Sequence, residues 1–139
     1  MLVSTKGRYA IRVMIDLAEH DRTTYIPLKE IAKRQNISEK YLEVIVKALS
    51  KAHYIEGLRG KGGGYRLVNE PSTYKVSDII ELMEGTLSPV STITGEPIAY
   101  ERNTQTMWEG LEDVIRQYLD GITIQDLSTP VQSGDFYVI

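Results

Sequence analysis

The 139-residue sequence contains no cysteine, and this absence removes several kinds of chemistry at once. A chain without thiols forms no disulfide, offers no thiolate to a metal, and has neither a cysteine nucleophile nor a thiol redox switch. Histidine is nearly as scarce, because only His20 and His53 occur, and both follow apolar helical runs. We interpret both as surface residues rather than metal ligands. The sequence therefore predicts no metal site and no cofactor.

A long apolar run is also missing. No segment approaches the roughly 18 consecutive apolar residues that cross a bilayer, and residues 1–6 lack the apolar core of a signal peptide. Apolar residues make up 42% and charged residues 25% of the chain, which is typical of a folded protein rather than a disordered one. We therefore expect no membrane association and a cytoplasmic location.

The charges are divided unevenly along the chain. Residues 1–66 contain 13 Lys and Arg and 7 Asp and Glu, a net charge of +6, whereas residues 67–139 contain 3 and 12, a net charge of −9. A positive half gains from contact with phosphates, and a negative half stays away from a duplex. The division fits a DNA-binding part joined to a regulatory part, and it fits a chance segregation of surface charge equally well.

Three short helices are predicted in the N-terminal half. Apolar residues at helical spacing indicate the first over residues 6–19, and the second begins at Pro27 and stops near Asn36. Ser38 is a good N-cap for a third helix of about a dozen residues. The second and third helices, joined by a tight turn, form a helix-turn-helix pattern in which the third is the recognition helix.

A glycine-rich, basic hairpin follows the third helix. Residues 54–59 and 65–68 have strand character and flank the glycine-rich tip. The tip is not a nucleotide-binding loop, because Gly60 and Lys61 lead into a strand and not into a helix. A plain flexible turn is one alternative. Directly after a recognition helix, we interpret the hairpin as a wing whose Arg59 and Lys61 reach phosphates or the minor groove.

The C-terminal half is predicted to contain a helix that mediates self-association. Ser77 is the expected N-cap of a fourth helix that ends at Gly85, and residues 86–100 are a predicted loop. A longer helix follows over residues 102–119, and Thr123 with Asp126 indicates a capping box. The long helix has a wide apolar face that would be adhesive if exposed. We expect it to form a homodimer, with packing onto its own domain as the alternative. The expected interface residues are Met107, Trp108, Leu111, Ile115 and Tyr118.

Together these patterns predict a mainly α-helical fold with a small β-hairpin wing. Residues 1–85 are the expected winged helix-turn-helix DNA-binding domain, and residues 86–139 the loop, the dimerisation helix and a C-terminal regulatory tail. Lysine can reach guanine or phosphate, and glutamate can accept from the amino group of cytosine. The candidate DNA contacts are Ser38, Lys40, Tyr41, Glu43 and Lys47 in the third helix and Arg59, Gly60, Lys61 and Gly62 in the wing. Each can also be an ordinary solvated residue, and Tyr41 can equally pack inward.

Three motifs in the N-terminal half resemble the Rrf2 family of winged-helix transcription regulators. They are residues 4–10, residues 37–43 and residues 59–65, and the resemblance extends over nearly the whole chain. It implies a homodimer on a two-fold double-stranded DNA operator, with recognition helices in the major groove and wings in the minor groove. Members that bind an iron–sulfur cluster place three cysteines before the long helix, but residues 90–107 contain neither Cys nor His. Sensing through such a cluster is therefore not expected.

Shorter motifs are most similar to one branch of that family. Residues 87–90, 119–127 and 136–139 resemble the cysteine-metabolism repressors of Gram-positive bacteria. That resemblance implies repression of cysteine and sulfur genes, and control through a complex with a cysteine synthase that O-acetylserine dissolves.

Two other classes of function are possible for a chain of this kind. A winged helix can bind another protein and never touch DNA, because a fold alone does not fix function. The positive charges of Lys40, Lys47, Arg59 and Lys61 argue against that alternative. An enzyme finds no support, since the sequence offers no nucleophile–base pair, metal constellation or phosphate loop. We therefore expect a non-enzymatic, DNA-binding repressor.

Overall fold

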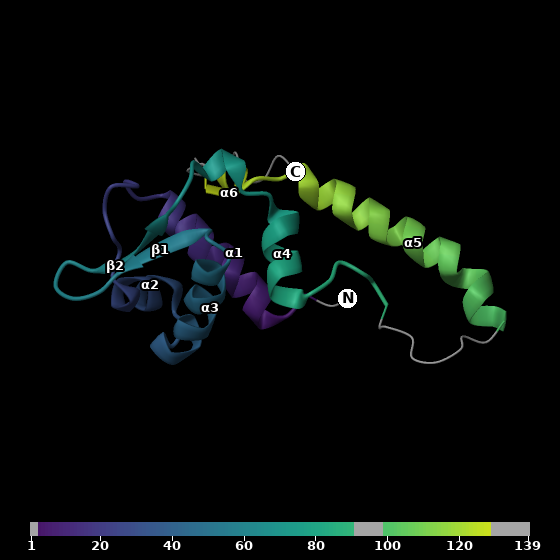
Figure 1. Ribbon diagram of the computed structural model, residues 1–139, viewed down its shortest axis with the longest axis horizontal. Helices are drawn as coiled ribbons and strands as arrows, with labels where there is room; N and C mark the ends of the chain where they lie inside the picture. The colour runs from purple at the N-terminus through teal and green to yellow at the C-terminus, as the bar shows by residue number, and fades with distance from the viewer. Residues whose placement is uncertain (1–2, 91–98, 129–139) are drawn as a thin grey trace.

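The computed structural model describes residues 3–90 and 99–128, with residues 99–101 described by their backbone only. The elements are α1 (Thr5–Ala18), α2 (Leu28–Gln35), α3 (Glu39–Lys51), β1 (Ile55–Leu58), β2 (Gly64–Leu67), the 3-10 turn η1 (Pro71–Thr73), α4 (Val76–Glu84), α5 (Ala99–Asp120) and α6 (Ile124–Ser128). In Figure 1 the first four helices and the hairpin form one body, and α5 projects away from it. The predicted fold class is confirmed.

Local signals in the sequence explain where the helices of the N-terminal half begin and end. The Ser38 hydroxyl accepts a hydrogen bond from the Tyr41 N–H at 3.1 Å and so caps α3, and Ser4 caps α1 in the same way through Gly7. Asn36 ends α2 in the left-handed conformation, with a φ of 55°. The three helices lie nearly where the periodicity of apolar residues placed them.

The core lies under the helix-turn-helix, with α1 at its centre. Helix α1 packs against α2, α3, α4, α6 and β2. The fully buried side chains are mostly aliphatic and come from nearly every element; among them are Val13, Met14, Ile31, Leu42, Ile45, Leu49, Ile55, Ile79 and Ile124. Since α3 contributes four buried residues, its inner face is fixed and its outer face is left free for a ligand.

The prediction that Ser77 caps the fourth helix is wrong. Helix α4 begins at Val76, two residues before the start that a Ser77 cap implies, and Ser77 is fully buried inside the helix, where its hydroxyl donates a hydrogen bond to Asp120. The first N–H of the helix is instead satisfied by a distant backbone group, because the Val76 N–H donates to the Ile122 carbonyl at 2.9 Å. A side-chain cap is therefore not needed, and the serine is free to tie α4 to the end of α5.

The C-terminal end of α5 is attached to the body, and the rest of the helix extends away from it (Figure 1). Arg116 pairs with Glu81 of α4 at 2.8 Å, in addition to the bond between Ser77 and Asp120. Helix α5 begins at Ala99, three residues before the prediction, because residues 99–101 contain neither proline nor glycine. Thr123 and Asp126 form the predicted capping box, with N–H···O distances of 2.9 and 3.1 Å. Residues 129–139, including the apolar end of the chain, lie outside the described residues.

Candidate nucleic-acid interface

Helix α3 has one face that contacts the core and one that is free. The core face is formed by Leu42, Ile45, Val46 and Leu49. The free face carries one stripe at helical spacing, Lys40, Val44, Lys47 and Lys51, with Glu43 beside it. All five of these residues are exposed. Three ammonium groups on one stripe make a surface suited to a line of phosphates.

The candidate cations of α3 and of the wing tip have no carboxylate partner among the described residues. Four arginines elsewhere are paired with acidic side chains: Arg22 with Glu70, Arg34 with Asp16, Arg66 with Glu56 and Arg116 with Glu81. Within the described ranges, by contrast, Lys40, Lys47, Arg59 and Lys61 make no ion pair within 4.0 Å. Their charge is therefore available to an anionic ligand.

Tyr41 is both partly exposed, as a DNA contact must be, and packed against another side chain, which was the alternative from the sequence. Its side chain is 37% exposed at the start of α3. Its ring also meets the edge of Tyr9 from α1, with 5.7 Å between the ring centres and 77° between the planes. The Arg12 guanidinium lies 4.9 Å from the centre of the Tyr9 ring. Tyr41 is thus held in one orientation while part of it stays accessible.

The wing is an antiparallel hairpin braced by a third segment. Strands β1 and β2 pair from Ile55 with Leu67 to Leu58 with Gly64. Ile26, just before α2, pairs with Tyr65 through two N–H···O bonds of 2.8 Å. This close approach requires glycine at position 64, because a Cβ there would lie 2.2 Å from the Ile26 carbonyl oxygen and φ is +149°. The pairing fixes the base of the wing relative to α2.

One basic residue of the wing is paired within the hairpin, and two others are exposed at its tip, where a ligand can reach them. Arg66 lies 4.2 Å over the Tyr25 ring and donates to Glu56 at 2.7 Å. The hydrogen bond that Arg66 donates to Glu56 raises the pKa of Arg66, and this cation therefore serves to stabilise the hairpin. Arg59 and Lys61 belong to the exposed tip, beside Gly60 and Gly62, which have open space around them.

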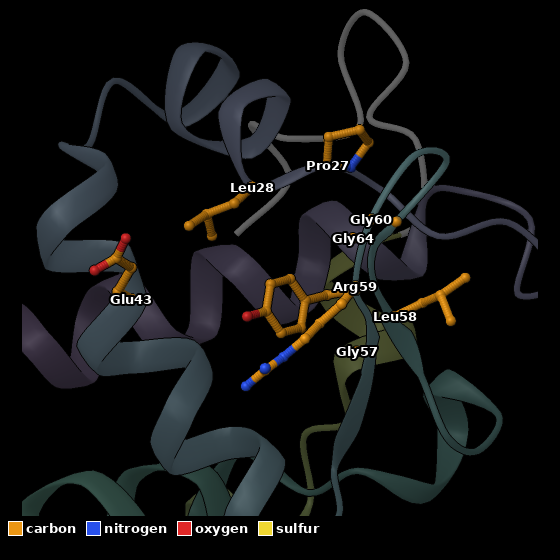
Figure 2. Close-up of a pocket in the computed structure, with 10 residues that line it drawn as sticks. Pro27, Leu28, Glu43, Gly57, Leu58, Arg59, Gly60 and Gly64 are labelled. Atoms are coloured by element: carbon orange, nitrogen blue, oxygen red, sulfur yellow. The ribbon is translucent and has the colours of Figure 1, made fainter.

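A groove of about 520 Å³ lies between α3 and the wing. Figure 2 shows Arg59 extending from the wing toward α3, where Glu43 stands on the far wall, and Leu28 at the start of α2 between them. Leu58 points to the other side of the hairpin. The structure therefore brings three of the predicted contacts, Glu43, Arg59 and Gly60, to one groove.

A buried carboxylate holds the helix-turn-helix in place. The Asp16 side chain of α1 is 1% exposed and accepts two hydrogen bonds of 2.9 Å from Arg34. Gln35 adds a third bond of 2.8 Å, and Arg12 donates to the side chain and the carbonyl of Gln35. The hydrogen bond to Asp16 raises the pKa of Arg34. These bonds fix the end of α2 on α1 immediately before the turn that leads into α3.

The apolar stripe of α5 is largely open. Met107, Leu111, Val114 and Tyr118, spaced at helical intervals, are 55%, 42%, 61% and 70% exposed. Trp108 and Ile115 are half-buried. Within residues 3–90 and 99–128, the stripe therefore stays largely exposed and does not pack onto its own domain. The sequence prediction did not include Val114 in the interface, although its spacing from Leu111 and Tyr118 places it there.

Two residues of the α3 surface were also missed. Val44 and Lys51 lie on the stripe of Lys40 and Lys47 but were not among the candidate contacts. The signal was available, because positions i, i+4, i+7 and i+11 share one side of a helix. The predicted contacts lie near the start of the helix and are mostly polar, whereas Lys51 lies near its end and Val44 is apolar.

Comparisons with known proteins match nearly the whole chain. A family model, Rrf2, described as "Iron-dependent Transcriptional regulator", matches residues 3–130. The chain is 38% identical over 129 residues to the HTH-type transcriptional regulator CymR of Bacillus subtilis, covering 93% of this chain and 91% of that one. It is similar to the solved structure of CymR, the global cysteine regulator of B. subtilis, with a TM-score of 0.79, 36% identity and coverage of 95% and 99%. The structure of T. potens IscR has a TM-score of 0.73 at 34% identity, covering 99% and 97%.

The family description implies iron, and the donor set of this chain does not fit it. The chain has no cysteine, so no thiolate is available to an iron–sulfur cluster. Among the described residues no three His, Cys, Asp or Glu side chains gather into a possible metal site. The Nδ1 atom of His20 lies 2.7 Å from the Asp16 carbonyl oxygen, and His53 is exposed. The residues of this chain therefore do not provide the ligands that iron binding by a cysteine-ligated cluster requires.

The helices of the described part include none that is long and apolar enough to cross a membrane. The relatives are named transcriptional regulators rather than enzymes, and this supports the DNA-binding interpretation over a module that binds only protein. With the family model matched over most of the sequence and a relative at 38% identity over most of both chains, this chain belongs to the Rrf2 family of transcriptional regulators.

Proposed function

We propose that the protein is a homodimeric repressor that binds a two-fold DNA operator, with α3 in the major groove and the wing in the minor groove. The observation that carries this proposal is the set of exposed cations on α3 and the wing tip that make no ion pair with the described residues, on two elements whose Glu43 and Arg59 line one groove. Phosphate contacts from these cations supply affinity, and the side chains between them read base edges. Residues 1–85 are the proposed DNA-binding domain, and residues 86–139 serve dimerisation and regulation.

The exposed stripe of α5 supports the dimer. Four large apolar side chains in a row on one helix are costly to leave in water, and pairing with a second copy buries them. Their spacing matches the seam of two helices packed side by side. A two-fold axis through this pair would present two copies of α3 to two half-sites.

The dimer is tested by adding a charge to the stripe. Val114→Asp places a carboxylate at a position that is 61% exposed in the single chain and buried in the proposed dimer. We expect sedimentation equilibrium to give a dimer for the wild type and a monomer for Val114→Asp. The matched control is Gln117→Asp, which adds the same charge on an exposed position of the same helix and should remain a dimer. A monomeric wild type, or a dimer in both variants, would refute the interface.

DNA binding is tested with upstream fragments of cysteine and sulfur genes. This target class follows from the name of the relative in B. subtilis, a global cysteine regulator. In fluorescence anisotropy, we expect tighter binding to some of these fragments than to scrambled DNA, weakened by Arg59→Ala. Lys75→Ala is the control, because Lys75 is exposed and pairs with Thr123 immediately before α6. Figure 1 shows α6 at a different end of the body from α3. Specific binding only to other promoters would keep the DNA-binding mechanism and reject the cysteine assignment. Absence of binding at low salt would reject both.

A complex with a cysteine synthase is the proposed means of regulation. The support is the resemblance of this chain to cysteine-metabolism repressors. The immobilised protein should retain a cysteine synthase from lysate, and added O-acetylserine should release it. Recovery of no cysteine synthase without O-acetylserine would reject this partner and leave the DNA-binding proposal intact.

A further inference from the structure

One apolar side chain interrupts the charged surface of the recognition helix. Val44 is 53% exposed and lies on the same stripe as Lys40, Lys47 and Lys51. Lys40 is one turn before it and Lys47 one turn after it. The apolar residues that hold α3 to the core lie on the opposite side of the helix. Val44 is therefore not among the residues of the described hydrophobic core.

The position of Val44 points to a base edge rather than to the backbone of a duplex. On a helix laid in the major groove, long cationic side chains at either end reach the phosphates, and the short side chains between them face the floor. Valine has no donor or acceptor, so it cannot read the polar pattern of the base edges. The one apolar group that the major groove offers among the four standard bases is the C5-methyl group of thymine.

Resting on the proposed function, we infer that Val44 selects thymine at one position of each half-site by packing its methyl groups against the thymine C5-methyl group. Glu43 and Arg59 line the adjacent groove, so polar readout lies on one side of Val44. Burial of one methyl group favours binding by about fourfold, which corresponds to about 0.8 kcal/mol. Two half-sites give about 15-fold if both thymines are contacted.

The test removes the methyl group from the DNA and its partner from the protein. The duplex is obtained by selecting tight binders of the wild-type protein from a random-sequence library. Each symmetric pair of thymines is then replaced by deoxyuridine, which lacks only the methyl group. For the wild type, one pair should lower affinity by about 15-fold. In Val44→Ala the penalty at that pair should fall below about threefold, because the side chain no longer reaches the methyl group. Alanine favours helix at this exposed site, so the variant should fold.

Two further variants separate a specific contact from general weakening. Lys47→Ala should lower affinity for every duplex and leave the deoxyuridine penalty unchanged, and Val44→Ile should retain the penalty. Equal penalties in the wild type and Val44→Ala at every thymine pair would overturn the inference while leaving the proposed function in place, and so would a wild type with no deoxyuridine penalty. Selection that enriches no sequence would overturn both.

Discussion

The buried carboxylate of Asp16 provides a test of how the helix-turn-helix is held together. Three hydrogen bonds to this charged acceptor, each taken at about 1.5 kcal/mol net, the low end for a charged group, give about 4.5 kcal/mol before solvent screening. Two of them come from Arg34, whose side chain is 40% exposed, so solvent screens part of their contribution. We therefore expect Asp16→Asn, which keeps the shape but replaces one acceptor by an amide donor, to lower the free energy of unfolding by about 2–3 kcal/mol.

Glu30→Gln is the matched control because Glu30 contacts the same arginine. Its carboxylate lies 3.7 Å from Arg34 but is 58% exposed, and such a pair contributes under about 0.5 kcal/mol. Both variants are compared with the wild type by urea unfolding followed by circular dichroism, at one protein concentration, since self-association shifts the apparent stability. If the losses in the free energy of unfolding for Asp16→Asn and Glu30→Gln differ by less than about 0.5 kcal/mol, burial of the Asp16 carboxylate is not important for stability.

Three further predictions concern the wing, its support and the absence of cysteine. Gly64→Ala forces a Cβ against the Ile26 carbonyl, so thermal unfolding should show a loss of stability of about 2 kcal/mol or more. Gly60→Ala, which has open space around it, should lose about 1 kcal/mol. Equal losses for the two variants would contradict the close approach at Gly64. Tyr74→Phe removes a hydroxyl that donates to the Tyr54 carbonyl at 2.7 Å, so urea unfolding should show a loss of about 1–2 kcal/mol; a loss below about 0.3 kcal/mol would oppose this. Burial raises the pKa of Tyr74 above 10.0, so the wild-type advantage should hold below that pH and vanish only as the pH rises above it. Iron chelators should leave DNA affinity in anisotropy unchanged, and a loss reversed by added iron would contradict the exclusion of a cluster.

Much of the fold could be predicted because its signals are local. Ser38 caps α3, Asn36 and Gly85 end α2 and α4 in the left-handed conformation, and Thr123 begins α6, all as the residue types indicate. The hairpin follows from β character on either side of a glycine-rich tip. Each of these features depends on residues a few positions apart, which a single sequence displays directly.

The features that could not be predicted depend on contacts between distant segments. Ser77 looks like a cap in sequence, but the carbonyl of Ile122 takes that role and leaves the serine to Asp120. The pairing of Asp16 with Arg34 joins two helices, and nothing in the local pattern distinguishes this buried carboxylate from its exposed neighbours. The assignment of Arg66 to the hairpin and of Arg59 to the groove likewise requires the positions of Glu56 and α3.

The central claim, that the free cations of α3 and the wing bind DNA phosphates, is tested most directly by the salt dependence of binding. Each phosphate contact contributes about 0.9 to the slope of log K against log salt concentration. Lys61→Ala removes two contacts from the proposed dimer, so the slope should become shallower by about 1.8, while Lys75→Ala should leave it unchanged. An unchanged slope for Lys61→Ala, or the same change for both variants, would contradict the account.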